Sequence, residues 1–219
     1  MTSASALTLH HFSESSASYR VRIALGLKGL SFDSVLVDIR EREQHAERYR
    51  ALNPQGLVPC LEVGEHCAIG QSSAMLEYLE EVGMGHSLLP RTAAERAEAR
   101  SLSQLIISDV APFQKTTLQR YLTDAFDFDE GAIGQWLSFW MGRGLRPIEA
   151  MVRNRVSQGG FVFGGQPGWV ECCLVPQLYN LRKFAVDLGP FPQLQALEAR
   201  CVELPAFEAA HPCHWRGLS

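Results

Sequence analysis

Four consecutive residues near the start of the chain, Ser-Ser-Ala-Ser at positions 15–18, could stabilise an anion. They lie between a short alternating segment at 7–11, which predicts a strand, and an apolar segment at 18–28 with helical spacing. Hydroxyls and free backbone N–H groups at the start of a helix can stabilise a thiolate or another anion. Taken alone, this segment is better explained by one serine that simply caps the helix.

A proline defines the second candidate segment, Leu-Val-Pro-Cys-Leu at positions 57–61. It follows Asn-Pro-Gln-Gly at 53–56, and a proline that opens a strand after such a turn is typical of a cis peptide bond. A cis bond between Val58 and Pro59 would expose the Val58 N–H and C=O to an extended, peptide-like ligand, which would pair as an added strand does. An ordinary trans proline at a strand edge is the alternative.

Gln71 and Ser72 form the third candidate segment, at the start of a predicted helix over 72–82 with Ser72 as its N-cap. The serine hydroxyl and the neighbouring N–H groups could bind a carboxylate there, or they could only cap the helix. Together the three segments could hold an anionic thiol at one end, a peptide backbone in the middle and a free carboxylate at the other end. Glutathione has those three features.

The elements that must position these segments predict an α/β unit of the thioredoxin-like type, in the order β-α-β-α-β-β-α. This order requires a parallel pairing of the first two strands and a closing antiparallel hairpin, with helices covering the sheet. Gly64 and Glu65 are expected to form the hairpin turn. The predicted strands are 7–11, 32–37, 58–63 and 66–69, and the predicted helices are 18–28, 40–52 and 72–82.

Strand signals almost vanish after residues 83–90, which are typical of a linker. Only helical patterns follow, so we expect two domains: a thioredoxin-like domain over 1–85 and an all-helical domain over 92–219. The predicted helices of the second domain are 93–107, 114–124, 131–156, 170–188 and 194–201.

Composition excludes several classes of protein. The chain has 219 residues, of which 46% are hydrophobic and 20% charged, with a net charge of −4. This mixture argues against disorder, and the acidic balance argues against general nucleic-acid binding. No apolar stretch approaches the ~18–20 residues that a membrane helix needs. The N-terminus, Met1–Leu9, lacks the positive flank and the apolar run of a secretory signal.

The six cysteines are scattered and form no CxxC pair. Without a secretory signal, this usage predicts reduced thiols in the cytoplasm. The tail His211-Pro212-Cys213-His214 matches no standard zinc spacing, so no metal site is predicted.

Three longer segments resemble the zeta class of glutathione transferases, which includes the maleylacetoacetate and maleylpyruvate isomerases. They are Ser-Ser-Ala-Ser-Tyr-Arg-Val-Arg-Ile-Ala-Leu at 15–25, Ala-Leu-Asn-Pro-Gln-Gly-Leu-Val-Pro at 51–59 and Gln-Ser-Ser-Ala-Met at 71–75. Segments of the helical half, at 163–165, 174–177 and 184–188, agree, so the resemblance covers roughly residues 7–210. It implies the glutathione transferase fold, a homodimer, and glutathione as a cofactor for cis-trans isomerisation of a maleyl compound to its fumaryl product.

The resemblance also implies residue roles. Ser15 corresponds to the serine that hydrogen-bonds the glutathione sulfur, with Ser16 as its neighbour. Val58 corresponds to the residue whose main chain binds the cysteinyl part, positioned by Pro59. The remaining assignments are Gln71 and Ser72 for the γ-glutamyl end, Gln44 and Gln114 for other groups of the tripeptide, and Arg182 and Lys183 for a substrate carboxylate.

Among the departures from the zeta pattern, two lie in the serine segment or directly before it. Ala17 replaces the cysteine that many zeta enzymes carry, which removes thiol-disulfide chemistry at that position. Glu14 stands where a basic residue often precedes the serine pair, and its carboxylate would repel an anionic substrate unless it is paired or points away. Two alternatives therefore stay open: transfer of glutathione to another small electrophile, such as a halogenated acid, and a non-catalytic binding protein with the same fold.

Overall fold

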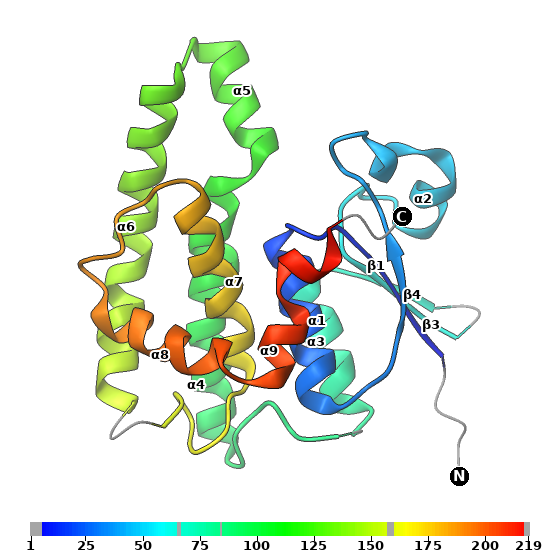
Figure 1. The fold of residues 1–219 in the computed structure, drawn as a ribbon, viewed down its shortest axis with the longest axis vertical. Helices are drawn as coiled ribbons and strands as arrows, with labels where there is room; N and C mark the ends of the chain where they lie inside the picture. Colours follow the sequence, from blue (N-terminus) through cyan, green and yellow to red (C-terminus); the bar gives the residue numbers. More distant parts are fainter. Residues whose placement is uncertain (1–5, 65–66, 84, 157–159, 217–219) are drawn as a thin grey trace. The chain divides into compact units, whose positions relative to one another are not determined.

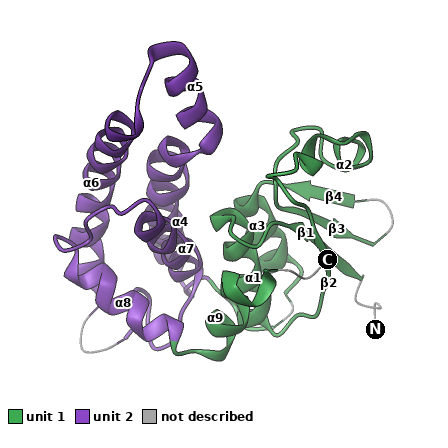
Figure 2. Cartoon of the chain, turned by 45° about the horizontal axis from the view of Figure 1, so that its top comes forward, with its two compact units in different colours: residues 1–88, 203–219 green, residues 89–202 purple. Residues whose placement is uncertain are grey.

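A computed structural model describes residues 6–64, 67–83, 85–156 and 160–216. The chain forms two compact units (Figure 2). Unit 1 comprises Met1–Leu88 together with Glu203–Ser219, and unit 2 comprises Leu89–Val202. This division differs from the expected 1–85 and 92–219, because the last segment of the chain returns to unit 1.

Unit 1 contains a four-stranded mixed sheet in the order β2-β1-β3-β4. The first two strands pair in parallel, β3 runs antiparallel to β1, and β4 closes the sheet as the antiparallel partner of β3. This topology confirms the predicted thioredoxin-like order; Glu65 of the expected hairpin turn lies outside the described residues. The elements are β1 (Leu7–His11), α1 (Ser16–Lys28), β2 (Asp33–Leu36), η1 (Glu43–His45), α2 (Glu47–Leu52), β3 (Cys60–Val63), β4 (Cys67–Gly70) and α3 (Ser72–Glu81).

Helix α1 is buried over most of its circumference, which explains its long apolar run. Val21, Ile23 and Leu25 have no exposed surface. The helix ends at Gly29, whose φ of 65° lies in the left-handed region and whose N–H donates to the Gly26 carbonyl. Glycine adopts this conformation without a steric penalty, so the Lys28-Gly29 step is a suitable end for the helix.

Two helix boundaries differ from the predictions. The expected helix over 40–52 is broken into η1 and α2, because Ala46 between them has extended backbone (φ −62°, ψ 145°). The N-cap of α3 is Gln71, with φ 61°, and Ser72 is the first helical residue. The prediction that Ser72 caps this helix was wrong by one position, because the chain enters the helix through the left-handed turn at Gln71.

The C-terminal segment forms a helix that the sequence pattern did not predict, α9 (Pro205–Ala210), followed by the 3-10 turn η4 (Pro212–Trp215). Figure 1 shows α9 beside α1, and the two helices are in contact. A Cβ atom at Gly26 would lie 3.3 Å from the Ala206 side chain, so the helices pack closely at this point. This close contact accounts for the return of the segment to unit 1.

Arg22 joins the C-terminal segment to the sheet. It is 2% exposed, and its guanidinium donates from Nε to the Ala210 carbonyl (3.0 Å) and from Nη2 to the Ser13 carbonyl (2.9 Å). A third contact joins Nη1 to Nδ1 of His11 at 3.0 Å. The guanidinium carbon also lies 5.4 Å from the ring centroid of Trp215, within the range of a cation–π contact. One side chain therefore fixes the end of β1, the loop after it and the C-terminal segment.

Unit 2 is all-helical, as predicted, and no paired strand occurs among its described residues. The predicted helix over 93–107 ends as an α-helix at Gln104 and continues as a π-helical turn. The predicted helix over 170–188 ends at Lys183, and Ala185 then adopts φ 53°. No described helix has both the length and the apolar character needed to cross a membrane. The elements are α4 (Ala93–Gln104), η2 (Leu105–Val110), η3 (Ala111–Gln114), α5 (Thr116–Phe126), α6 (Glu130–Arg155), α7 (Trp169–Lys183) and α8 (Pro192–Val202).

A buried carboxylate organises the start of α7. Glu171 is 1% exposed and accepts hydrogen bonds from the Gly168 N–H (2.8 Å) and the Val162 N–H (2.8 Å). Burial raises the pKa of Glu171 above its usual value. Since Gly168 has no side chain to cap the helix, Glu171 satisfies the N–H groups of both the helix start and the preceding loop.

We expect His11 to make the stability of unit 1 depend on pH. Burial and the Arg22 guanidinium lower the pKa of His11 from 6.5 to about 3. Below pH 6.5 the unfolded chain binds a proton that the folded protein excludes, so stability falls as the pH falls toward 3 and is unaffected above 6.5. The slope should approach about 1.4 kcal/mol per pH unit, and His11→Gln should remove most of it.

Urea unfolding at several pH values between about 4.5 and 7.5 measures this effect. The range is chosen because the slope arises below the reference pKa of histidine. His86→Gln, at an exposed position of the same unit, serves as the matched control and should leave the slope unchanged. A His11→Gln protein that keeps the full wild-type slope would contradict the assignment.

Candidate active site

The sheet register brings the three candidate segments to one end of the sheet. His10, near the end of β1, pairs with Cys60 at the start of β3, and Cys60 pairs with Gly70 at the end of β4. The segment at 15–18 follows β1, the Val58–Pro59 bond precedes β3, and Gln71 follows β4. Segments that are far apart in the sequence therefore meet in unit 1, as a single extended ligand requires.

Ser15 is both a helix cap and an available donor. It is the N-cap of α1, and its Oγ accepts a hydrogen bond from the Ser18 N–H at 3.2 Å. No acceptor for its own hydroxyl hydrogen is found in the described part of the chain, so that hydrogen can be donated to a ligand. Ser15 and Ser16 are both half-buried. The capping role and the predicted binding role are therefore compatible.

The loop that carries Ser15 is held from two sides. The Phe12 N–H donates to the Ser18 hydroxyl at 3.3 Å, and Arg22 binds the Ser13 carbonyl. These bonds fix the backbone on both sides of Glu14. A hydroxyl on a rigid loop can stabilise an anion without the entropy cost of ordering the loop.

The Val58–Pro59 peptide bond is cis, so the structure selects the cis alternative. The preceding carbonyl, of Leu57, accepts hydrogen bonds from the Tyr49 hydroxyl (2.7 Å) and the Asn53 amide (2.7 Å). Val58 itself is half-buried, and its N–H and C=O have no hydrogen-bond partner among the described residues. An unpaired donor and acceptor on one residue suit the main chain of a peptide-like ligand.

Gln44 contributes an unsatisfied acceptor. It lies in η1, and its Oε1 is buried with no partner in the described ranges. Buried polar atoms in proteins nearly always have a hydrogen-bond partner, so an unpaired one is a sign that a ligand or water completes the site. The predicted role of Gln44 in binding the tripeptide stays a prediction that this observation favours.

Arg20, a basic residue of α1 that was expected to support the site only indirectly, lies close to Ser72. Its Nη1 donates to the Ser72 hydroxyl at 2.6 Å, and its Nε has no partner among the described residues. Arg20 is 2% exposed, and no carboxylate of the described chain pairs with it. A buried guanidinium without a counter-ion, next to the positive end of the ten-residue helix α3, favours an anion at this point.

Gln71 is exposed, and its side-chain amide donates to Oε1 of Gln55 at 2.8 Å. This bond connects the start of α3 to the loop that contains Val58 and Pro59. In the sequence, Arg20 stands out only as a basic residue within an apolar helical segment. Its partner Ser72 is too distant in the sequence for a local pattern to connect the two residues.

The other predicted residues lie in unit 2, where Gln114 and Arg182 already have partners. Gln114 is buried and forms a reciprocal amide pair with Gln177, with distances of 3.1 and 2.9 Å. Arg182 is ion-paired with Glu198 at 2.5 Å. Lys183, the last residue of α7, is exposed. Their assignments to glutathione and to a substrate carboxylate stay predictions.

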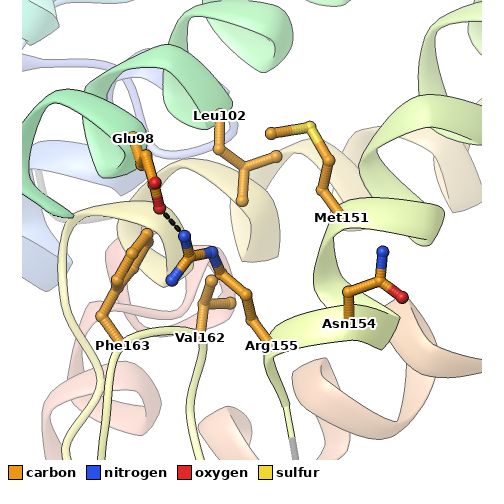
Figure 3. A pocket seen from close by; sticks show the side chains of 7 residues that line it. All are labelled: Glu98, Leu102, Met151, Asn154, Arg155, Val162 and Phe163. Carbon is orange, nitrogen blue, oxygen red and sulfur yellow. Dashed lines mark ion pairs between the residues drawn. The ribbon is translucent and has the colours of Figure 1, made fainter. Parts of the chain in front are cut away.

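A hollow of about 650 Å³ occurs within unit 2 (Figure 3). Arg155 and Glu98 form an ion pair across it, and none of the predicted site residues lines it. In the described part of the chain, no group of three metal-binding side chains is found. The hollow is lined by Glu98, Leu102, Met151, Asn154, Arg155, Val162 and Phe163.

Comparison with known proteins gives consistent matches. Residues 14–82 match the family model of the glutathione S-transferase N-terminal domain. The chain is 38% identical over 206 residues to the maleylpyruvate isomerase of Ralstonia sp, covering 94% of this chain and 97% of that protein. It is 40% identical over 206 residues to the maleylacetoacetate isomerase of Rhizobium meliloti, covering 93% and 95%.

Solved structures agree over nearly the full length. A holo structure of a maleylpyruvate isomerase, described as a bacterial glutathione S-transferase of the zeta class, superposes with a TM-score of 0.92 and 36% identity, covering 97% of this chain and all of that chain. The maleylacetoacetate isomerase of Anaeromyxobacter dehalogenans, with glutathione bound in its active site, has a TM-score of 0.87 and 36% identity, covering 99% of each chain.

Arg20 is expected to contribute to ligand affinity rather than to the stability of the fold. Replacement by Met removes a buried charge, so the free energy of unfolding should stay the same or increase. Glutathione should bind roughly 10- to 100-fold more weakly, because hydrogen bonds to charged groups contribute about 1.5–3 kcal/mol. Calorimetric titration and thermal unfolding measure the two effects separately.

Ser72→Ala is the companion variant. If Arg20 acts through Ser72, the double variant Arg20→Met/Ser72→Ala should bind glutathione no more weakly than Arg20→Met alone, since the two residues act as a unit. Destabilisation of Arg20→Met with unchanged glutathione affinity would show a structural role and rule out the assignment.

Proposed function

The chain belongs to the zeta class of glutathione transferases, and from this membership we propose that it is a glutathione-dependent isomerase converting a maleyl compound, maleylpyruvate or maleylacetoacetate, to its fumaryl isomer. The observation that carries the proposal is the coexistence in unit 1 of three unsatisfied features. These are the Ser15 hydroxyl, the unpaired Val58 main chain and the Arg20 charge behind Ser72. They suit the thiol, the peptide backbone and the carboxylate of glutathione.

Bound glutathione supplies a nucleophilic thiolate for reversible addition to the cis double bond of the substrate. The Ser15 hydroxyl donates a hydrogen bond to the sulfur, which favours the thiolate over the thiol. The N–H groups at the start of α1 add the favourable potential of a helix N-terminus. Val58 holds the cysteinyl main chain, and Gln71, Ser72 and Arg20 hold the γ-glutamyl end.

The cysteines of the chain support a reactive thiol that belongs to the ligand. Cys60, Cys172, Cys173 and Cys201 are buried. Burial raises the pKa of Cys60 to about 11, and it also raises the pKa of Cys201. Position 17, within the serine segment, is alanine. Cys67 and Cys213 are exposed, but neither belongs to the three candidate segments. The thiolate of the proposed mechanism is therefore that of glutathione.

The proposal extends to a homodimer in the cytoplasm, with glutathione and a small substrate as its ligands. The family resemblance supports the dimer, and the scattered reduced cysteines support a reducing compartment. The net charge of −4 does not favour nucleic acid as a partner.

A spectrophotometric assay with maleylpyruvate and with maleylacetoacetate tests the activity. Conversion is expected only when glutathione is present, and thiol titration should show that glutathione is not consumed. Stoichiometric loss of glutathione thiol would instead indicate transfer to an electrophile. Failure of the protein to bind immobilised glutathione would overturn both enzymatic functions.

Ser15→Ala is expected to lower kcat/KM by roughly 10- to 100-fold, since a hydrogen bond to a charged group contributes about 1.5–3 kcal/mol. Loss of the helix cap should also cost about 1 kcal/mol of stability, so activity is compared at a temperature where both proteins are folded. Ser15→Thr keeps both the hydroxyl and the cap and is the matched control. Undiminished activity of Ser15→Ala would refute the role of this hydroxyl.

A further inference from the structure

Glu14 places a carboxylate directly before the serine that is assigned to the glutathione sulfur. A negative charge there disfavours a neighbouring thiolate and repels a substrate that itself carries carboxylates. In the structure, Oε1 of Glu14 lies 2.8 Å from Nη2 of Arg216, and the side chains are 27% and 58% exposed. The charge of Glu14 is therefore balanced by a residue of the C-terminal segment.

The pair is held from both sides by Arg22. Nη2 of Arg22 binds the carbonyl of Ser13, the residue before Glu14. The same guanidinium lies against the ring of Trp215, the residue before Arg216, and the Trp215 indole N–H donates to the Ala209 carbonyl at 3.0 Å. Because both backbones are fixed, this ion pair loses less side-chain and backbone freedom than an ordinary surface pair does.

The neighbouring cation is committed elsewhere. The Arg40 guanidinium lies 5.2 Å from the Phe12 ring centroid and forms two hydrogen bonds to Asp38, from Nε at 3.0 Å and from Nη2 at 2.7 Å. Arg40 and Asp38 therefore balance one another. The charge of Glu14 also acts on Arg40, but Arg216 is the cation that forms a direct ion pair with Glu14.

We propose that Arg216 is a specificity-determining residue, which neutralises Glu14 and so lets the Ser15 site accept a thiolate and a dianionic maleyl substrate. This inference rests on the proposed function and deepens it. It makes the C-terminal segment part of the active site, although the segment lies outside the α/β sequence that precedes the linker. Arg216 acts through Glu14 and does not itself bind the substrate.

Three variants test the proposal: Arg216→Ala, Glu14→Gln and the double variant Glu14→Gln/Arg216→Ala. Arg216→Ala unmasks the carboxylate, so the pKa of the bound glutathione thiol should rise by about 0.5–1 unit and KM for the dianionic substrate should rise about three- to tenfold. The double variant should behave as the wild type, whereas Glu14→Gln leaves the Arg216 cation unbalanced and should shift both quantities in the opposite direction. The effect of Arg216→Ala should shrink at high salt, because the pair is partly exposed.

The thiol pKa is read from the ultraviolet absorbance of the thiolate in the glutathione complex, and KM from steady-state kinetics. Arg48→Ala is the matched control, because it also removes an exposed charge from an ion pair of unit 1, with Glu43. It should change neither quantity. If the double variant is as impaired as Arg216→Ala, the masking role is overturned, because removal of the carboxylate then fails to rescue the loss of the cation.

Failure of the proposed function gives a different result. If the wild type binds glutathione but isomerises neither maleyl compound, the isomerase assignment fails, whereas the thiol titration still decides the role of Arg216. An unchanged thiol pKa in Arg216→Ala, in a protein that isomerises normally, overturns the inference alone.

Discussion

The geometry of the candidate site depends on the buried guanidinium of Arg22. A charge that is removed from water must be satisfied by well-placed acceptors, and here main-chain carbonyls of Ser13 and Ala210 provide them. The imidazole of His11 completes the set, and it can do so only in its neutral form, because a second cation at 3.0 Å would be strongly repelled. The same network fixes the loop that presents Ser15 and anchors Trp215, so the active-site loop and the C-terminal segment are one mechanical unit.

The arrangement separates two electrostatic tasks. At the start of α3, the buried charge of Arg20 is screened little by salt, and in the proposed function it faces a carboxylate of the ligand. At the start of α1, Glu14 and Arg216 form an ion pair, so the proposed thiolate would be favoured by local donors rather than by a net charge. An acidic chain can bind an anionic tripeptide in this way, because the relevant potential is set within a few ångströms by helix ends and N–H groups.

Local pattern predicted the fold of unit 1 well, because alternation and helical spacing are properties of neighbouring residues. The strand Leu7–His11, the β-α-β-α-β-β-α order of the elements and the three candidate segments were each indicated by neighbouring residues. What failed depended on distant contacts. The six-residue helix α9 is too short to give a periodic signal, and its position is decided by Gly26 and the donors of Arg22.

The same reasoning applies to the residues that the pattern missed at the site. Arg20 and Arg216 acquire their roles from Ser72 and Glu14, which no sequence window contains together with them. Gln114 illustrates the converse case, since its amide is used by Gln177 in the helical unit. Motif spacing identifies which backbone segments approach a ligand, whereas the partners of long polar side chains are settled only by tertiary structure.

The return of residues 203–216 to unit 1 has a consequence for biosynthesis. Translation completes the sheet and its helices long before the ribosome reaches α9 and Trp215, and the whole of unit 2 is made in between. Until then the donors of Arg22 lack the Ala210 carbonyl, and the apolar surface of α1 around Gly26 stays uncovered. The part of the chain that is made first is thus finished only after unit 2 has been synthesised, and the ligand site matures only when residues 203–216 have joined it.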